Sequence, residues 1–403
     1  MSARDIPWCV PDLSGREVEY VTDAVASGHI GPAGPYLERL ERQVAEVSDA
    51  ACAVTTCCGT DALHLALLLA GVRPGDEVVV PALTFVATAN AVRHLGAYPV
   101  VVDIDPEYWQ IDPCAVAAFL TGCEQRRGRV INPASGRRVA AVVPVHLLGH
   151  PAPLAELDEL AQDSGIAVVA DGAQGLGATY RGCGIASGGV LTSLSFNANK
   201  IITTGGGGAV LTGDPDLAAR ARYLGAQAAS GTYQHDEVGH NWRMSNVSAA
   251  IGCAQVERLA DLVAAKRRIH DAYSEALVNV PGVSQPGCAP WATTTRWFAP
   301  LAVDPATAGI DAAELRAHLA SKGVSAGPVW TPLHQTRAHA GCAPAPCPVA
   351  ERLGRAVLQL PCSPGMTEDE VSRTINAVRT GVRDAARGSA FRGIRARASV
   401  LRP

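Results

Sequence analysis

The sequence predicts an α/β protein in which a large domain, built on a mainly parallel sheet, precedes a smaller C-terminal α/β domain. Between residues 50 and 212, short runs rich in β-branched residues alternate with apolar helical patterns. Such alternation requires crossover connections, which join parallel strands. After Pro281, proline, threonine and tryptophan become more frequent, and two further helical patterns follow. The first observation predicts the large domain and the second predicts the smaller one.

The individual elements follow from the same patterns. The predicted strands are Ala53–Thr55, Glu77–Val80, Pro99–Asp103, Val139–Val145, Ile166–Ala170, Leu191–Phe196 and Ala209–Thr212. Helical patterns between them include Thr60–Leu69, Thr84–Leu95 and Leu154–Asp163. Asn246 to Leu277 is predicted as one long helix, and the smaller domain is expected to contain the helices Ala312–Lys322 and Glu368–Ala385.

We place the boundary between the domains near residue 256. Residues 1–255 are predicted to form the large domain with its N-terminal segment, and residues 256–386 the smaller domain. No internal repeat or long linker is visible between them. Residues 387–403 carry five arginines and little apolar periodicity, so we expect a disordered tail there.

Composition excludes several classes of protein. The chain has 403 residues and a formal net charge of -4, whereas a nucleic-acid binder would usually present a basic face. The longest apolar run, Leu65 to Val72, is far shorter than the ~20 residues of a membrane span. The N-terminus lacks an apolar signal core, and the twelve cysteines are scattered without paired CxxC units. We therefore expect a reduced cytoplasmic enzyme with no metal site and no disulfide framework.

Lysine is rare in this chain, which makes each lysine informative. Lys200, Lys266 and Lys322 are the three lysines among 34 basic residues. Lys266 stands beside two arginines on a predicted helix, where arginine would serve as well. Lys322 precedes a glycine at a helix end, a common place for a cation. Lys200 instead follows a predicted strand and precedes four glycines, and guanidinium cannot replace an amine in nucleophilic chemistry.

Lys200 and Asp171 together indicate a pyridoxal phosphate (PLP) site. Asp171 directly follows the apolar strand Ile166–Ala170, and ligands of open α/β sheets bind beyond the carboxyl ends of the strands. A lysine amine forms the Schiff base to the aldehyde of PLP, and an aspartate keeps the pyridine nitrogen protonated. Their separation of 29 residues allows them to follow neighbouring strands. Taken singly, Lys200 could be a solvated lysine beside a hairpin, and Asp171 a helix cap or turn residue.

A phosphate group also needs a binding site, and the segment Thr56–Leu63 is a candidate. It leaves a strand, turns at Gly59 and opens a helix at Thr60, where backbone N–H groups could bind a dianion. Ser195 could add a hydroxyl, and Phe85 follows another strand end where it could stack on the pyridine ring. An ordinary capped helix start and a core phenylalanine are the alternatives.

At this point several motifs resemble the DegT/DnrJ/StrS family of sugar aminotransferases, which are PLP enzymes of fold type I. The resemblance extends from Pro7 to Val382. Its motifs are Gly31–Tyr36, Gly59–Leu63, Pro81–Thr88, Pro144–Gly149, Asp171–Gln174, Ser195–Lys200 and Gly239–Met244. The chain departs from the family in having four glycines after the lysine, where Gly-Glu-Gly-Gly is frequent, and Gly188-Gly189 where Gly-Asp is usual.

The resemblance implies a role for each matching residue of the cofactor site. Lys200 would bind the aldehyde carbon and Asp171 the pyridine nitrogen. Gln174 would bond the phenolic oxygen and Phe85 would stack on the ring. The phosphate would be held by Gly59, Thr60 and Ser195.

Residues of the partner subunit and the substrate site are implied in the same way. Asn241 would reach the cofactor phosphate of the neighbouring subunit, which implies a homodimer with composite active sites. His334 would face the sugar. His146 follows a strand end and is either an active-site or a structural histidine, and Arg243 contacts either substrate or the dimer interface. Trp297 is interpreted as a core residue.

The predicted reaction is transfer of an amino group from L-glutamate or glutamine to a keto sugar. The segments Asn199–Gly208 and Pro332–Gln335 are most similar to family members that act on nucleotide-linked 4-keto-6-deoxysugars, the legionaminic-acid and perosamine type. Three alternatives remain open: an aminotransferase acting on a keto-cyclitol or other natural-product sugar, a PLP-dependent sugar dehydratase, and a non-catalytic regulator. Related dehydratases carry histidine at the position of Lys200, which disfavours the second.

Overall fold

A mixed sheet forms the centre of the large domain in the computed structural model, which describes residues 5–187 and 191–400. Its main strands are β1 (Cys52–Thr56), β2 (Glu77–Pro81), β3 (Tyr98–Val102), β6 (Arg137–Val142), β7 (Ala167–Asp171), β10 (Leu191–Ser195) and β11 (Gly208–Thr212). They lie in the order β1-β11-β10-β7-β6-β2-β3. All seven predicted strands are thereby confirmed, with small shifts at their ends.

The sheet is mainly parallel, as predicted. Parallel pairing joins β10 to β7, β7 to β6, β6 to β2 and β2 to β3. β11 alone among these seven strands runs the other way, between β10 and β1. β2 is buried along its whole length, as expected for a parallel strand covered on both faces. The carboxyl ends of β2, β7 and β10 therefore lie at one edge of the sheet.

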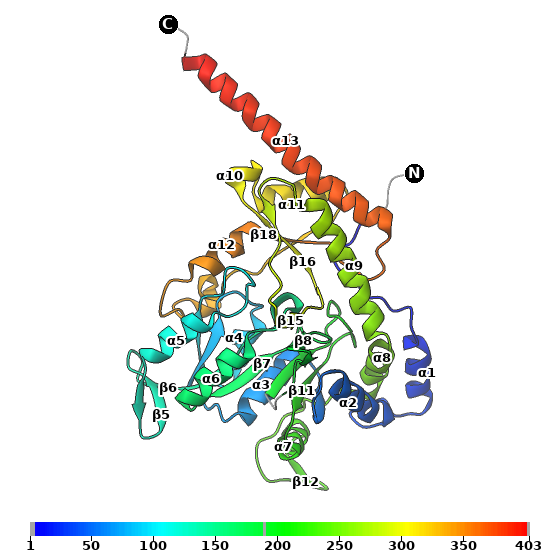
Figure 1. Cartoon of the computed structure of the whole chain (residues 1–403). Coiled ribbons are helices and arrows are strands. Elements are labelled where there is room, and N and C mark those ends of the chain that lie inside the picture. Colours follow the sequence, from blue (N-terminus) through cyan, green and yellow to red (C-terminus); the bar gives the residue numbers. More distant parts are fainter. Residues whose placement is uncertain (1–4, 188–190, 401–403) are drawn as a thin grey trace.

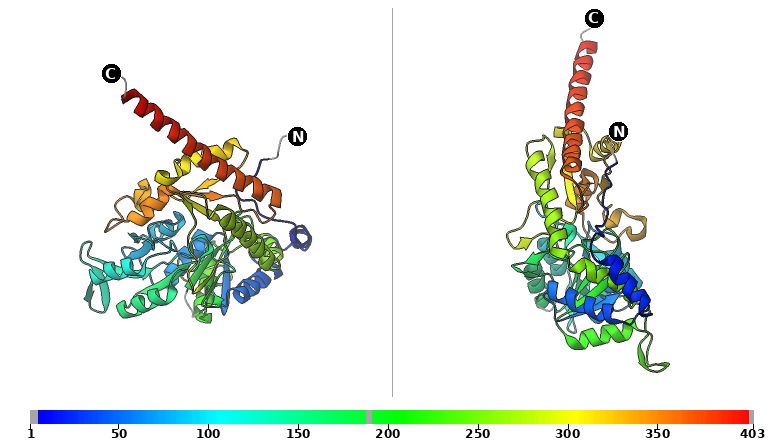
Figure 2. Two further views of the ribbon diagram at one scale, coloured as in Figure 1. Left: turned by 45° about the horizontal axis from the view of Figure 1, so that its top comes forward. Right: turned by 90° about the vertical axis from the view of Figure 1, so that its right-hand side faces the viewer.

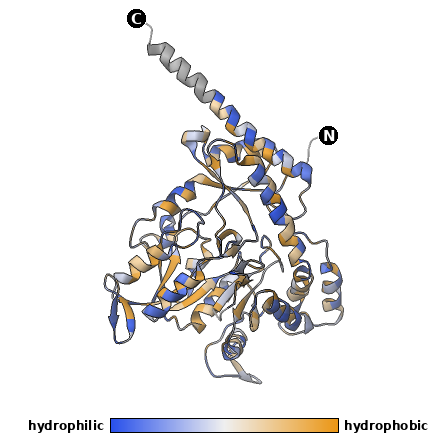
Figure 3. Ribbon diagram, viewed as in Figure 1, coloured by the Kyte–Doolittle hydropathy of each residue, from blue (hydrophilic) through white to orange (hydrophobic). Residues whose placement is uncertain are grey.

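Helices surround this sheet and give the large domain its layers. They are α1 (Glu17–Ala26), α2 (Pro35–Val47), α3 (Gly59–Leu69), α4 (Ala87–His94), α5 (Pro113–Thr121), α6 (Leu154–Ser164), α7 (Pro215–Gly225) and α8 (Asn246–Val256). Apolar residues concentrate on the strands and on the helix faces turned toward them, while polar residues lie outside (Figure 3). The minor elements are β4 (Glu124–Arg126), β5 (Arg129–Asn132), β8 (Thr179–Tyr180), β9 (Cys183–Gly184), β12 (Ala229–Gly231), β13 (Gln234–His235), β15 (Ala292–Thr293), η1 (Leu147–Gly149), η2 (Leu333–Gln335) and η3 (Arg337–His339).

The smaller domain has its own sheet, in the order β14-β16-β18-β17, and lies at the top of the molecule in Figure 1. These strands are β14 (Val283–Ser284), β16 (Ala299–Val303), β17 (Gly327–Pro328) and β18 (Val357–Leu360). The associated helices are α9 (Leu259–Leu277), α10 (Pro305–Ala308), α11 (Ala312–Ser321), α12 (Pro348–Ala356) and α13 (Glu368–Val400). The pairing is antiparallel throughout this sheet.

One expectation about helices is wrong. The single helix predicted from Asn246 to Leu277 is interrupted between α8 and α9, and beside this break Arg258 forms an ion pair with Asp12 at 3.1 Å. The disordered tail predicted from residue 387 stays a prediction; helix α13 extends to Val400, and residues 401–403 lie outside the described chain. Alanine and arginine are strong helix formers, so α13 continues past the point where it leaves the body of the protein (Figure 2).

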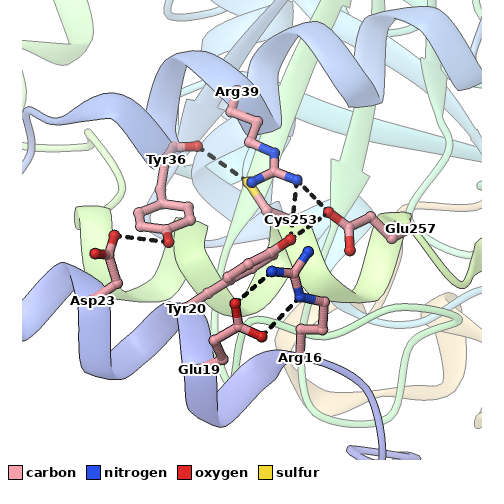
Figure 4. Close-up of polar contacts among 8 residues, drawn as sticks. All are labelled: Arg16, Glu19, Tyr20, Asp23, Tyr36, Arg39, Cys253 and Glu257. Atoms are coloured by element: carbon pink, nitrogen blue, oxygen red, sulfur yellow. Dashed lines mark hydrogen bonds and ion pairs between the residues drawn. The ribbon is translucent and has the colours of Figure 1, made fainter.

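Helices α1, α2 and α8 are joined by a polar network that the sequence did not suggest (Figure 4). Arg39 of α2 forms an ion pair with Glu257, and the hydroxyl of Tyr20 donates to the same carboxylate at 2.8 Å. The hydroxyl of Tyr36 donates to Asp23 at 2.9 Å. These contacts fix the N-terminal helices against α8, which follows the motif containing Asn241.

Two negative findings concern the residues that the structure describes. Over 5–187 and 191–400, no helix combines the length and apolar character needed to span a membrane. Within the same ranges, no three histidine, cysteine or acidic side chains come together in a way that would hold a metal ion.

Candidate active site

Asp171 and Lys200 come from neighbouring strands, as the spacing predicted. Asp171 is the last residue of β7, and the parallel register aligns it with Ser193 of β10, whose following loop carries Lys200. The carboxylate of Asp171 accepts hydrogen bonds from the hydroxyl of Thr88 at 2.8 Å and from the N–H of Ala173 at 3.0 Å. Both donors are neutral, so the chain supplies orientation without neutralising the charge.

Burial raises the pKa of Asp171, although the bonds from Thr88 and Ala173 and the charge of Lys200 oppose this change. A carboxylate that is 6% exposed and bonded only to neutral donors retains lone pairs for a cationic N–H partner. The protonated nitrogen of a pyridine ring is such a partner.

Lys200 is partly buried and lies against an aromatic ring. Its Nζ lies 4.2 Å from the ring centroid of Trp297, a cation–π distance. Burial lowers the pKa of Lys200 to about 8, while the charges of Asp171 and Cys9 act in the opposite direction. The amine is therefore much closer to its neutral, nucleophilic form at physiological pH than an exposed lysine would be.

The three residues predicted to hold phosphate do come together. Gly59 is the first residue of α3, and a Cβ atom placed on it would lie 2.5 Å from Cβ of Ser195 and 2.8 Å from its hydroxyl oxygen. Glycine is thus required for the end of β10 to approach the helix start. Thr60 follows in the first turn, and the thiol of Cys58 accepts from the N–H of Asp61 at 3.3 Å. The result is a helix N-terminus with an adjacent hydroxyl, an arrangement suited to a phosphate.

Phe85 and Gln174 also lie at this edge. Phe85 follows β2 and is 50% exposed, which is unusual for a phenylalanine and contradicts the alternative of a core residue. Gln174 is 3% exposed, and its carbonyl oxygen accepts from the N–H of Leu148 at 2.7 Å. That bond leaves the amide NH₂ as the donor for a ligand oxygen.

His146 is fully buried and its tautomer is fixed by its surroundings. Nδ1 accepts from the N–H of Ala152 at 3.0 Å, so in the neutral ring the proton resides on Nε2. Nε2 has no hydrogen-bond partner among the described residues. Burial lowers the pKa of His146 to about 4, and the nearby His150 adds to this effect. The ring is therefore neutral at pH 7 and presents one unpaired N–H donor.

Arg243, predicted to contact substrate or the dimer interface, and His334, predicted to face the sugar, both contact acidic side chains of the protein. The guanidinium of Arg243 forms an ion pair with Glu41 at 2.9 Å and donates to the carbonyl of Thr55, so this side chain braces α2 against β1. His334 contacts Glu351 at 3.2 Å, and the N–H of Leu333 before it donates to Ala82, which follows β2.

Asn241 lies on the protein surface next to the phosphate turn. Its side chain is exposed, and the carbonyl of the following residue, Trp242, accepts from the N–H of Cys57 at 2.7 Å. A surface amide beside the phosphate turn is in a position that a second subunit could also approach.

Two residues of the site escaped the sequence reasoning. Thr88 lies in the motif Pro81–Thr88, so its position after β2 was the available signal. Trp297 belongs to the smaller domain and carries no local motif. Its placement depends on Gly149, where a Cβ atom would collide with Thr295 and lie 3.1 Å from the backbone nitrogen of Trp297.

The residues present fit pyridoxal phosphate. A buried carboxylate that forms no ion pair within the described residues, a lysine of lowered pKa, an exposed ring and a helix N-terminus with a hydroxyl match the groups of that cofactor one by one. Fold and site together define a PLP-dependent enzyme of fold type I.

Comparison with known proteins supports the same class of enzyme. Residues 11–379 match the DegT/DnrJ/EryC1/StrS aminotransferase family, to which the chain belongs. It is 35% identical over 371 residues to GDP-perosamine synthase of Escherichia coli O157:H7, covering 91% of this chain and 95% of that protein. It is 36% identical over 350 residues to dTDP-3-amino-3,4,6-trideoxy-alpha-D-glucose transaminase of Streptomyces venezuelae, covering 86% and 87%. The structure of S. venezuelae DesV in complex with a ketimine intermediate superposes with a TM-score of 0.84 at 33% identity, covering 94% of this chain and 99% of that one. The protein is thus a PLP-dependent aminotransferase.

Proposed function

We propose that this enzyme transfers an amino group from L-glutamate or glutamine to the keto group of a nucleotide-linked sugar, most specifically a 4-keto-6-deoxysugar. The similarity to GDP-perosamine synthase and to a dTDP-sugar transaminase over most of the chain supports a nucleotide-sugar acceptor. The observation that carries the reaction type is the Lys200 amine, lowered in pKa and facing Asp171 across the carboxyl edge of the sheet.

Each residue of the site is proposed to have a distinct role toward the cofactor. Bound PLP supplies an aldehyde that condenses with amines and a ring that withdraws electrons from the bonds around that carbon. Asp171 orients the ring and keeps its nitrogen protonated, and Phe85 covers one face. Gly59, Thr60 and Ser195 hold the phosphate, and the amide NH₂ of Gln174 donates to the phenolic oxygen.

Lys200 is the residue that moves protons. Its Nζ would take a proton from the α-carbon of the amino donor and would deliver it to the cofactor carbon that carried the aldehyde, which is bonded to the same nitrogen, and the acceptor half-reaction would run this transfer backward. A group with a pKa near 8 accepts and releases protons readily at neutral pH, because efficiency is greatest when the pKa lies near the working pH.

We also propose a homodimer in which Asn241 completes the phosphate site of the partner subunit. Its support is the exposed position of Asn241 beside the phosphate turn, together with the family resemblance. On the same basis, His334 is proposed to face the sugar from the smaller domain, and neutral His146 to donate its free N–H into the site. Arg243 is proposed only as a brace, since both of its described contacts are to α2 and β1.

The test is a pair of half-reactions. The PLP-loaded enzyme is mixed with L-glutamate, L-glutamine or L-alanine as a control, and its visible absorbance and the keto-acid product are followed. The aminated form is then mixed with 4-keto-6-deoxy and 3-keto nucleotide sugars and with a keto-cyclitol. We expect one keto acid and one amino sugar per cofactor, with the 4-keto sugar fastest.

The same experiment separates the alternatives. Preference for the cyclitol would replace the proposed acceptor. Loss of a sugar hydroxyl without gain of nitrogen would indicate a dehydratase. An absorbance spectrum unchanged by every amino donor would indicate a regulator. Lys200→Ala provides the control, since it should lack both half-reactions.

A further inference from the structure

Lys266 is a buried lysine that has no carboxylate partner among the described residues. It lies on α9, is 1% exposed, and has no carboxylate within 4.0 Å in the described ranges 5–187 and 191–400. Its ammonium donates to the carbonyl of Trp297 at 3.0 Å and to the carbonyl of Cys362 at 2.9 Å, and it lies 3.7 Å from the sulfur of Cys362. Burying an ammonium is costly unless its protons are bonded, so these acceptors determine where it sits.

This position contradicts the expectation that arginine would serve as well at residue 266. A planar guanidinium is larger and presents five donors in a fixed fork, whereas the enclosed site offers two carbonyls and a sulfur. The lysine joins three segments that are distant in sequence: α9, Trp297 just before β16, and Cys362 two residues after β18. Lys266 therefore fixes the position of the Trp297 backbone.

Trp297 in turn makes two contacts with the catalytic segment. Its ring lies against the Nζ of Lys200, with 4.2 Å from nitrogen to ring centroid. Its indole N–H donates to the carbonyl of Asn199, the residue before Lys200, at 2.6 Å. Arg296, immediately before Trp297, has a φ of 55°, a strained value for a residue with a side chain. The surrounding structure thus constrains Trp297 strongly.

The N-terminal segment closes the same cluster. The thiol of Cys9 lies 3.7 Å from the carbonyl of Asn199, and the N–H of Cys362 donates to the carbonyl of Trp8 at 3.1 Å. The ring of Trp8 stacks on Phe298 at 4.9 Å. Trp297 and Cys362, whose carbonyls accept from the Lys266 ammonium, are therefore both linked to the Lys200 segment. Trp297 contacts it directly, and Cys362 is linked to it through Trp8 and the neighbouring Cys9.

We infer that Lys266 is a positioning residue for the reaction: by holding the carbonyl of Trp297, it places the indole ring against the Lys200 amine and the indole N–H on Asn199. The inference rests on the proposed role of Lys200 as the reactive amine. It assigns to Lys266 no contact with cofactor or substrate.

The test measures how the Lys200 amine titrates in the cofactor-free enzyme. Because the chain has three lysines, acetic anhydride labelling followed by mass spectrometry reports each amine separately as a function of pH. The variants are Lys266→Met, Lys266→Gln, Trp297→Leu and the double variant Lys266→Met/Trp297→Leu. The matched control is Lys322→Met, the same substitution at the exposed cap of α11. Asp171 and Cys9, the charged or titratable groups that act on Lys200, stay unchanged in all of them.

We expect Trp297→Leu to lower the labelling midpoint of Lys200 by about one pH unit, because the aromatic face no longer stabilises the ammonium. Lys266→Met should lower it in the same direction, and the double variant should go no further, since the two residues act in series. Lys322→Met should leave it at the wild-type value. An unchanged midpoint in Lys266→Met, or additive shifts in the double variant, would overturn the inference.

One measurement, made on the wild-type protein, does not depend on whether the variants fold. Lys266 should resist labelling in the native enzyme at every pH at which Lys322 reacts, and labelling as fast as Lys322 would refute the buried contact. Lys266→Gln, which keeps N–H donors without the charge, replaces Lys266→Met if the latter unfolds. If Lys200 proves not to bind the cofactor, the proposed function fails while these shifts remain measurable, so the two failures are distinguishable.

Discussion

Two buried carboxylates in this enzyme have opposite surroundings. Glu41, on α2, is 8% exposed and accepts bonds from the N–H and hydroxyl of Thr55 at 2.9 and 3.0 Å. It also pairs with Arg243 at 2.9 Å and Arg222 at 3.1 Å. Asp171, at the carboxyl end of β7, is 6% exposed, and among the described residues its donors are one hydroxyl and one backbone amide.

The difference shows how one kind of group serves either structure or chemistry. Two guanidinium groups neutralise the carboxylate of Glu41, and these contacts hold α2, β1 and the segment around Arg243 together. Asp171 forms no ion pair within the described residues, and burial raises its pKa although the more distant charge of Lys200 acts against this. A site that keeps a charge unpaired sacrifices stability for a ligand that will pair with it.

Removing the charge of Asp171 should have the largest effect on activity. We expect Asp171→Asn to lower kcat by about 10³-fold, the size of effect seen when a preorganised electrostatic partner is lost. The cofactor-free variant should be at least as stable as the wild type at pH 7, because ionisation of a carboxyl whose pKa is raised on folding opposes the folded state. Steady-state kinetics measures kcat, and thermal unfolding measures stability. A clear loss of stability with an unchanged kcat would contradict this account, because that pattern is the one expected for Glu41.

Glu41→Gln should produce the opposite pattern. Breaking this buried pairing leaves two guanidinium groups without their carboxylate, so we expect the free energy of unfolding to fall by about 3 kcal/mol. The kcat of the folded enzyme should stay close to wild type. Denaturant unfolding with parallel kinetics at low temperature provides the measurement. A large fall in kcat without loss of stability would mean that Glu41 and Arg243 belong to the catalytic site.

The pH dependence of cofactor loading sharpens the comparison further. Only the neutral Lys200 amine condenses with an aldehyde, and burial lowers its pKa to about 8. The loading rate should therefore rise about tenfold per pH unit below that value and level off above it. Asp171→Asn should move the midpoint to lower pH, because the carboxylate favours the protonated amine, whereas Glu41→Gln should not move it. Stopped-flow absorbance measures the rate, and an unchanged midpoint in Asp171→Asn would contradict the proximity of the two groups.

The smallest effect is expected at an exposed pair. Arg16 and Glu19 form an ion pair on α1 with side chains that are 55% and 58% exposed. Water and salt screen such pairs, so Arg16→Gln should leave both the unfolding midpoint and kcat unchanged. Thermal unfolding at low and high salt checks this, and a salt-sensitive fall in the midpoint would show that the network of Figure 4 stabilises the protein more than its exposure suggests.

Much of the sheet and of its reactive edge could be predicted from sequence. Strand patterns located β7 and β10, and residue chemistry singled out Lys200 and Asp171, because strand ends and a rare lysine leave local signals. The break between α8 and α9 leaves no such signal in the local sequence, and the Arg258 side chain beside it contacts Asp12, which is distant in sequence.

The interpretation of Lys266 was wrong, and that of Trp297 was confirmed but incomplete, for the same reason. A helix with two arginines beside a lysine predicts a solvated face, and nothing local indicates that Lys266 is buried against distant carbonyls. Trp297 is buried as expected, yet its ring also lies against Lys200, because the smaller domain folds back over the carboxyl edge of the large sheet. Contacts between segments so far apart are set by tertiary packing.

The central claim is that Lys200 is the amine that binds the cofactor, and borohydride reduction tests it most directly. Reduction converts the carbon–nitrogen double bond between lysine and PLP into a stable secondary amine, whose added mass marks one peptide. With three lysines in the chain, mass spectrometry separates the possibilities completely. The account predicts the added mass on the peptide containing Lys200 and on no other. Modification of Lys266 or Lys322 instead, or a loaded enzyme in which no lysine carries the mass, would contradict it.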